Sequence, residues 1–393
     1  LLRNTDRVYF DNAATSQKPQ CVLDAVEEFY QKYNANVLRG LYPLSVEATE
    51  RYEAARRTVQ RFIHAACPEE IIFTRNATES MNLVAYSYGM ANLKAGDEIL
   101  VSIMEHHSNI LPWQMVSRAT GAKLVFLECE PDGTITKEKM DAAFSEHTRM
   151  VAVTQVSNVL GCVNDIPELV KRARACGAAI LMDAAQSAPH MPIDVQKLDV
   201  DFVAFSGHKM LAPMGIGVLY GKQELLEKMP PFLTGGEMID RVTRERAVFA
   251  ELPHKFEAGT VNAGGAVALA AAIDYLESVG WKEITEREEM LTAQLLAGMK
   301  IIPGVHILGS GDEKEHCGIV SFTVDDVHPH DIASILDEAH VAVRAGHHCA
   351  QPLLEWLDIS SCARASVAFY NTPEDVGRFL DQLAQVRRMM GYE

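Results

Sequence analysis

The stretch Asp201-Phe202-Val203-Ala204-Phe205-Ser206-Gly207-His208-Lys209 predicts a buried strand that ends shortly before a lysine. Alternating apolar residues favour the strand, and the small, polar and basic residues after it reach one rim of a sheet. Open α/β sheets bind their ligands at such a rim. Loss of water there would lower the pKa of Lys209 and favour imine formation with a carbonyl group. A solvated loop lysine is the alternative.

A second apolar strand ends in a carboxylate, within Leu181-Met182-Asp183-Ala184-Ala185-Gln186. An aspartate in this place can face a pyridinium nitrogen and keep it protonated, so that the ring withdraws electrons. Gln186 follows three residues later, within reach of a phenolic oxygen on the same ring. Together with Lys209, these residues indicate pyridoxal 5'-phosphate as the cofactor. Asp183 could instead be a helix cap or an ion-pair partner.

The composition is that of a globular protein with an acidic surface. The 393 residues include 36 Lys and Arg against 53 Asp and Glu, which gives a formal net charge of -17. This balance argues against nucleic acid or an anionic membrane as a partner. The sequence has no apolar run long enough to span a bilayer and no signal-peptide pattern at its start, so we expect a cytoplasmic location. Because the first residue is not Met, we expect further residues before Leu1.

Strands and helices alternate along the first two thirds of the chain. This alternation predicts an α/β fold with a mostly parallel central sheet covered by helices on both faces. A helix is expected to begin at Ser45, as its N-cap, and to run to about Ala66. The expected strands are residues 8–10, 70–74, 99–103, 123–127, 150–156, 179–183, 201–205 and 215–220.

A change of pattern after Gly264-Gly265 predicts a second, smaller α+β domain. Long helical patterns fill residues 266–278 and 281–299, and short strands then alternate with helices. We expect the N-terminal residues to fold back onto this part. The predicted domains are a large one at 17–262 and a small one made of 1–16 plus 263–393.

The junction between a strand and a helix at Arg75-Asn76-Ala77-Thr78-Glu79-Ser80 is suited to binding phosphate. Free backbone N–H groups at a helix N-terminus, together with the hydroxyl of Thr78, can hold an anion. Plain capping of the helix by Thr78 explains the pattern equally well.

Cys349 differs from the other seven cysteines, which are scattered and form no disulfide framework. It follows two histidines and Gly346 in a loop that is expected to be partly exposed. The nearby cation of Arg344 would favour its thiolate, the nucleophilic form. The histidines could suggest zinc, but adjacent residues of an extended segment point to opposite sides, and a second ligand pair at zinc spacing is missing from the sequence. No metal site is therefore predicted.

Several segments resemble those of a known family. Asp183-x-x-Gln186, followed by Ser206-Gly207-His208-Lys209, is similar to the pyridoxal-phosphate segment of the class V aminotransferases, which have fold-type I. Further segments are similar to the group II, SufS-type cysteine desulfurases: Glu105-His106-His107-Ser108-Asn109-Ile110-Leu111-Pro112-Trp113-Gln114, Arg344-Ala345-Gly346-His347-His348-Cys349-Ala350-Gln351-Pro352, and Arg364-Ala365-Ser366 ahead of Tyr370-Asn371-Thr372. The similarity runs nearly from end to end.

The resemblance implies roles for the candidate residues. The catalytic residues would be Lys209, which binds the cofactor and moves protons, His106, which lies over the ring with a pKa near neutrality, and Cys349. Arg364 would grip the substrate carboxylate with its guanidinium fork. The implied substrate-binding residues are Arg364, Asn158 and Arg344. The implied cofactor-binding residues are Lys209, Asp183, Gln186, His106, Ala77, Thr78, Asn158, Ser206, His208 and Thr260.

The resemblance also implies a reaction and its partners. L-Cysteine would be converted to L-alanine, and the sulfur would remain as a persulfide on Cys349. An acceptor protein of the SufE or SufU type would then take it for iron–sulfur cluster assembly. The chain would form a homodimer, because Thr260 is expected to reach the phosphate of the neighbouring subunit. His330, at a predicted helix start, would lie near the mouth of the site and help to engage a zinc-bearing acceptor.

Alternatives and departures from the family pattern remain. The substrate could be L-selenocysteine, the enzyme could catalyse another class V reaction, or the protein could be a non-enzymatic sulfur carrier that uses only Cys349. Leu38 stands where the family usually has His, and Val261 where it usually has Pro. Leu38 would alter the entrance to the pocket or a partner surface, and neither departure touches the expected chemistry.

Overall fold

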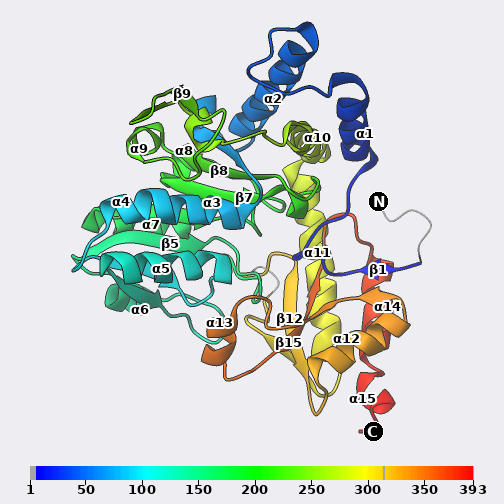
Figure 1. The fold of residues 1–393 in the computed structure, drawn as a ribbon. Coiled ribbons are helices and arrows are strands. Elements are labelled where there is room, and N and C mark those ends of the chain that lie inside the picture. The colour runs from blue at the N-terminus through cyan, green and yellow to red at the C-terminus, as the bar shows by residue number, and fades with distance from the viewer. Residues whose placement is uncertain (1–5, 313–314, 393) are drawn as a thin grey trace.

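The computed structural model describes residues 6–312 and 315–392, which contain a larger and a smaller sheet (Figure 1). Within these residues, the larger sheet has seven strands in the order β2-β8-β7-β6-β5-β3-β4. They are β2 (Ile71–Thr74), β3 (Glu98–Ser102), β4 (Lys123–Leu127), β5 (Thr148–Thr154), β6 (Ala179–Asp183), β7 (Phe202–Ser206) and β8 (Gly217–Gly221). β8 is antiparallel to both neighbours and the other pairs are parallel, which confirms the predicted sheet.

Helices bury both faces of the larger sheet. They are α1 (Gln20–Glu28), α2 (Pro43–Phe62), α3 (Ala77–Leu83), α4 (Met90–Asn92), α5 (Leu111–Thr120), α6 (Lys137–Ala143), α7 (Ile166–Cys176), α8 (Val195–Leu198), α9 (Gln223–Lys228) and α10 (Ala263–Val279). Along β6, Ile180 and Met182 pack with α2, α7 and α10, whereas Ala179 and Leu181 pack with α3 and α5. Side chains of a strand alternate between faces, so the uninterrupted apolar run is explained by burial on both sides.

The start of α2 corrects the sequence-based expectation. Tyr42 occupies the cap and Pro43 is the first helical residue, a position where the missing N–H of proline is not needed. Ser45 lies inside the first turn, and its Oγ donates to the carbonyl oxygen of Asn36 at 2.6 Å. The predicted cap at Ser45 is therefore wrong, and the helix ends at Phe62, four residues earlier than expected.

The smaller sheet lies beside the larger one and is antiparallel throughout, in the order β11-β12-β15-β14 (Figure 1). Its strands are β11 (Val305–Leu308), β12 (Ile319–Val324), β14 (Arg344–Gly346) and β15 (Cys362–Ser366), and the accompanying helices are α11 (Trp281–Lys300), α12 (Pro329–Glu338), α13 (Gln351–Trp356), α14 (Pro373–Leu383) and α15 (Val386–Met389). β1 (Val8–Tyr9) pairs with β13 (Val341–Ala342), so N-terminal residues do fold back. The domain boundaries at residues 17 and 262 stay a prediction.

The sequence pattern missed one hairpin, formed by β9 (Ile239–Val242) and β10 (Ala247–Phe249). Nearly all of its side chains are exposed, so the alternation of buried and exposed residues that marks a strand is missing there. None of the described helices combines the length and the apolarity needed to cross a membrane.

Candidate active site

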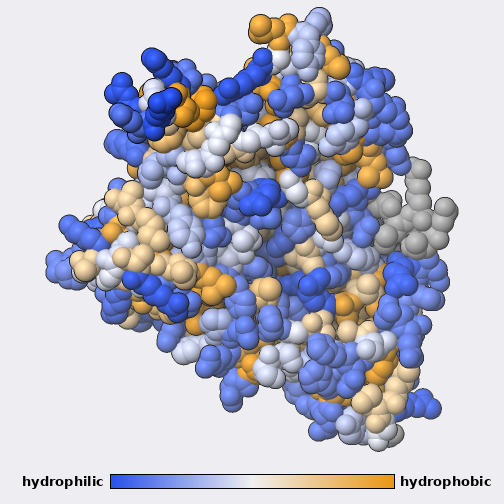
Figure 2. Space-filling view, viewed as in Figure 1, coloured by the Kyte–Doolittle hydropathy of each residue, from blue (hydrophilic) through white to orange (hydrophobic). Residues whose placement is uncertain are grey.

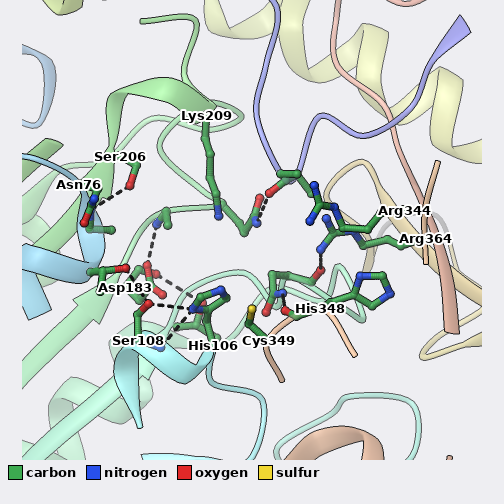
Figure 3. A pocket seen from close by; sticks show the side chains of 18 of the residues that line it. Asn76, His106, Ser108, Asp183, Ser206, Lys209, Arg344, His348, Cys349 and Arg364 are labelled. Carbon is green, nitrogen blue, oxygen red and sulfur yellow. Dashed lines mark hydrogen bonds between the residues drawn. The ribbon is translucent and has the colours of Figure 1, made fainter. Parts of the chain in front are cut away.

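A cavity of about 600 Å³ lies where the carboxyl ends of the parallel strands face the loop after β14. Figure 3 shows Lys209 and Cys349 on opposite sides of this cavity, with Arg344 and Arg364 together at one end. Its lining contains every predicted site residue except Thr260, which is exposed. The lining residues are Ala13, Ala14, Asn76, Ala77, Thr78, Met81, His106, Ser108, Thr154, Asn158, Asp183, Ala185, Gln186, Ser206, His208, Lys209, His330, Arg344, Ala345, Gly346, His347, His348, Cys349 and Arg364.

Lys209 reaches the cavity from a short helix, Gly207–Lys209, directly after β7. Burial of its amine lowers its pKa to about 8, while the negative charge of Asp183 acts in the opposite direction. Near neutral pH a usable fraction of Lys209 is therefore the free amine, which is the form that attacks a carbonyl carbon.

Asp183 ends β6 and is buried. Burial raises its pKa to about 6, and a hydrogen bond from the backbone N–H of Ala185 at 2.8 Å and the charge of Lys209 limit the rise. Asp183 thus remains mostly ionised at neutral pH. A buried carboxylate of this kind can keep a proton on a facing ring nitrogen.

His106 lies in the cavity as expected, but its pKa differs from the expected value. Its Nδ1 accepts the backbone N–H of Ser108 at 3.1 Å. Burial, reinforced by the positive charge of Lys209, lowers the pKa of His106 to about 3. The expected pKa near neutrality is therefore wrong: the ring is neutral throughout the physiological range, with Nδ1 as an acceptor and the proton on Nε2.

The start of α3 and the end of β7 form one end of the cavity. Asn76, not Thr78, caps α3, because its side chain accepts the N–H of Glu79 at 2.9 Å. The Thr78 hydroxyl hydrogen-bonds the Ser108 hydroxyl at 2.7 Å, and Ser206 Oγ accepts the N–H of Ala77 at 2.8 Å. Hydroxyl and backbone N–H groups thus gather at a helix N-terminus, which suits a phosphate.

Buried polar atoms in the cavity lining test whether pyridoxal phosphate fits. Gln186 Nε2 donates to the carbonyl of Ala13 at 2.9 Å, and Asn158 Nδ2 to that of His348 at 2.8 Å. Five buried side-chain atoms of the cavity lining have no hydrogen-bond partner among the described residues: Gln186 Oε1, Asn158 Oδ1, His208 Nδ1, His348 Nδ1 and Arg364 Nε. Such atoms are costly unless a ligand or water contacts them, so the lining fits a polar ligand of this kind.

Two arginines, both close to Asp11, define the other end of the cavity. Arg344 forms a fork with Asp11, with Nε–Oδ1 and Nη2–Oδ2 distances both 3.0 Å, and this bond raises its pKa. Arg364 is buried, donates to the carbonyl of Asn158 at 2.7 Å and lies 3.5 Å from Asp11. Burial lowers the pKa of Arg364 to about 10, so it stays cationic at neutral pH and can bind a carboxylate.

Cys349 is half-buried, in a loop whose backbone is strained. Both His348 (φ 51°) and Cys349 (φ 55°) are in the left-handed region, which costs an L-residue other than glycine roughly 1–2 kcal/mol. Burial raises the pKa of Cys129 and Cys362 to about 11 and that of Cys162 to about 12. These three thiols are therefore protonated at neutral pH, whereas Cys349 lies in the cavity lining.

Sequence reasoning missed Asn76 and Ser108 as cavity residues, and Asp11 as the partner of Arg344. The signal for Asp11 was a carboxylate directly after a predicted N-terminal strand. Its partner Arg344 is 333 residues away, so only the folded chain brings them together. Residues 6–312 and 315–392 contain no group of three or more His, Cys, Asp or Glu side chains that could hold a metal ion.

Comparisons with known proteins cover nearly the whole chain. The aminotransferase class-V family model matches residues 8–379. A probable cysteine desulfurase of Halalkalibacterium halodurans is 51% identical over 385 residues, covering 98% of this chain and 94% of that protein. The solved apo cysteine desulfurase of Thermococcus onnurineus is 42% identical to this chain, with a TM-score of 0.94. A cysteine desulfurase of Escherichia coli, solved in an S-sulfonic acid form, is 38% identical, with a TM-score of 0.90. Each alignment covers 98% of this chain and 95% of the other.

Proposed function

Since the chain belongs to the aminotransferase class-V family, we propose that it is a pyridoxal-phosphate-dependent cysteine desulfurase of the group II, SufS type. The observation that carries the proposal is the shared cavity: Lys209 enters it from the larger sheet and Cys349 from the loop after the smaller sheet's β14. A sulfur carrier without enzymatic activity would need the thiol but not the buried Lys209–Asp183 pair.

The residues of the cavity would divide the reaction between them. Bound pyridoxal phosphate would withdraw electrons from the α-carbon of the substrate. Arg364 binds the carboxylate of L-cysteine, and the Lys209 amine moves the α-proton. The Cys349 thiolate attacks the substrate sulfur: an S–S bond forms and the C–S bond breaks. With proton return to carbon, the products are L-alanine and a Cys349 persulfide, and no external oxidant or reductant is needed.

Acceptor, assembly and location belong to the same proposal. The half-buried position of Cys349 supports transfer of the persulfide to an acceptor protein of the SufE or SufU type, for iron–sulfur cluster assembly. His330 also lines the cavity and would contact that acceptor. We also propose that the chain forms a homodimer, because the exposed Thr260 would complete the phosphate site of a second copy. The proposed location is the cytoplasm. L-Selenocysteine remains the competing substrate.

The proposal is tested by incubating the protein with L-cysteine and measuring alanine and protein persulfide. Lys209→Ala is expected to lose both products and the visible absorption band of the cofactor. Cys349→Ala is expected to keep the band and lose the persulfide. Cys21→Ala, a change in an exposed thiol on α1, is the matched control. Persulfide found by mass spectrometry mainly on Cys317 or Cys362 would refute the assignment, and parallel assays with L-selenocysteine measure substrate preference.

A further inference from the structure

We propose that His107 is a positioning residue that holds the Cys349 loop in place for sulfur transfer, assisted by His347. The inference rests on the proposed function, because it concerns the thiol that takes up the sulfur. His107 begins the short helix His107–Asn109 after β3, whereas Cys349 belongs to the loop that follows β14. The contact between them therefore joins the two walls of the cavity.

The loop needs support from outside because its own backbone conformation is unfavourable. His348 and Cys349 both have positive φ angles and neither is glycine. Two neighbouring residues in this region persist only where surrounding contacts hold them. The side chain of Cys349 would otherwise lose its direction toward the cavity.

Hydrogen bonds between the loop and the two histidines provide that support. The backbone N–H of His107 donates to the carbonyl of Cys349 at 2.7 Å, and His107 Nε2 accepts the backbone N–H of Gln351 at 3.2 Å. His347 Nδ1 accepts the N–H of Cys349 at 3.1 Å. The two imidazole rings lie against each other, with centroids 5.7 Å apart. The peptide groups around Cys349 are thus held from both sides.

His107 acts through the loop and not on the reacting atoms. The described residues that line the cavity include its neighbours His106 and Ser108 but not His107 itself. Accepting a hydrogen bond at Nε2 requires the neutral ring. Burial and the adjacent His347 both lower the pKa of His107, which favours that form.

The test compares His107→Leu, which removes the acceptor, with His107→Gln, whose side-chain oxygen can replace it. A small displacement of a reacting group costs about ten- to a hundredfold in rate. His107→Leu is therefore expected to form the Cys349 persulfide about tenfold more slowly or worse, and His107→Gln to recover most of the rate. In the apoprotein, alkylation of Cys349 by iodoacetamide, followed by mass spectrometry, is expected to be faster in His107→Leu because the loop is released.

A double-mutant cycle separates loop positioning from a general loss of stability. His347→Ala removes the second acceptor, and because both rings act on one loop, the double variant should lose less than the product of the single effects. The matched control is His147→Leu, an exposed histidine before β5, at the opposite edge of the sheet. It should behave as the wild type in both assays.

Wild-type persulfide and alkylation rates in His107→Leu would overturn the inference, as would a loss that His107→Gln does not repair. If His107→Leu does not fold, His347→Ala becomes the test. Wild-type rates of alkylation and of persulfide formation in His347→Ala would then overturn the inference. The proposed function is tested separately by Cys349→Ala. If that variant loses the persulfide while His107→Leu is unaffected, the positioning role fails and the function stands.

Discussion

At the scale of single residues, the cavity sets the charge state of its chemistry by burial. Burial drives both Lys209 and Asp183 toward their neutral forms, and the attraction between their charges opposes it. The outcome is an amine with a pKa of about 8 beside a carboxylate with a pKa of about 6. At neutral pH the carboxylate is therefore mostly charged, while part of the amine is free to react.

Replacing Asp183 tests this balance. The rate at which the apoprotein incorporates pyridoxal phosphate, followed by absorbance, should rise with pH through about 8 in the wild type, because the neutral amine reacts. In Asp183→Asn the charge that favours the ammonium form is gone, so the midpoint should move to lower pH. Cysteine turnover should nevertheless fall at least about a hundredfold, because the facing ring nitrogen loses its anionic partner.

Asp274→Asn, on the surface of α10 beside Arg61, is the control for this change and should leave the midpoint in place. A midpoint in Asp183→Asn that stays at its wild-type pH, or moves to higher pH, would contradict the charge interaction described for these two residues.

At the scale of elements, β8 and the start of α3 approach so closely that glycine is required. A Cβ on Gly217 would lie 2.5 Å from Asn76 Cα and 2.7 Å from its carbonyl carbon. Both are backbone atoms, so the turn that leads into α3 would have to move. That turn carries Ala77 and Thr78, which belong to the end of the cavity suited to phosphate.

Gly217→Ala is therefore expected to weaken pyridoxal-phosphate binding at least about tenfold and to lower the free energy of unfolding by about 1–3 kcal/mol. Equilibrium dialysis and urea unfolding measure the two effects. Gly377→Ala in α14 is the matched control, since the described structure leaves its Cβ position open within 4 Å. Alanine favours a helix over glycine by about 1 kcal/mol, so this control should be neutral or stabilising. Equal cofactor affinity in Gly217→Ala and wild type would show that the close approach does not shape the site.

At the scale of the whole molecule, apolar side chains are exposed over the upper part of the view in Figure 2, at the start of α2 and over β9 and β10. Leu41 is 97% exposed and Val242 61%. Met214 is 72% exposed, and its neighbour Gly215 accepts a hydrogen bond from Asn262 at 2.8 Å, which ties this segment to that of Thr260. Exposed apolar side chains of this kind, with Met214 close to the segment of Thr260, are consistent with the proposed homodimer.

Thr260→Val keeps the shape of the side chain and removes its hydroxyl. We expect the variant to remain dimeric in sedimentation experiments, while the rate of cofactor dissociation rises about tenfold, as expected for a lost hydrogen bond to a charged group. Thr243→Val, in the exposed β9–β10 hairpin, controls for the loss of a surface hydroxyl. A monomer that holds its cofactor as tightly as the wild type would exclude a contribution of Thr260 across an interface.

The sequence by itself determined the elements and the local chemistry. Apolar runs such as the one before Ser206 predicted strands buried on both faces, because side-chain alternation is a local property of the chain. Lys209, Asp183 and Gln186 indicated the cofactor, and the segments around His106, Lys209, Cys349 and Arg364 carried the resemblance to the family. The same local rules wrongly placed the N-cap of α2 at Ser45. Pro43, two residues earlier, also suits a helix start, and the helix begins there.

Only the tertiary structure decided the pairings across the cavity and the protonation state of its groups. Asp11 meets Arg344, and His107 meets the Cys349 loop, across more than 200 residues of sequence. The pKa of His106 lies near 3 rather than near neutrality because burial removes water from the ring and Lys209 adds a positive charge nearby. Desolvation and distance depend on which side chains the fold brings together, and the order of residues along the chain specifies neither.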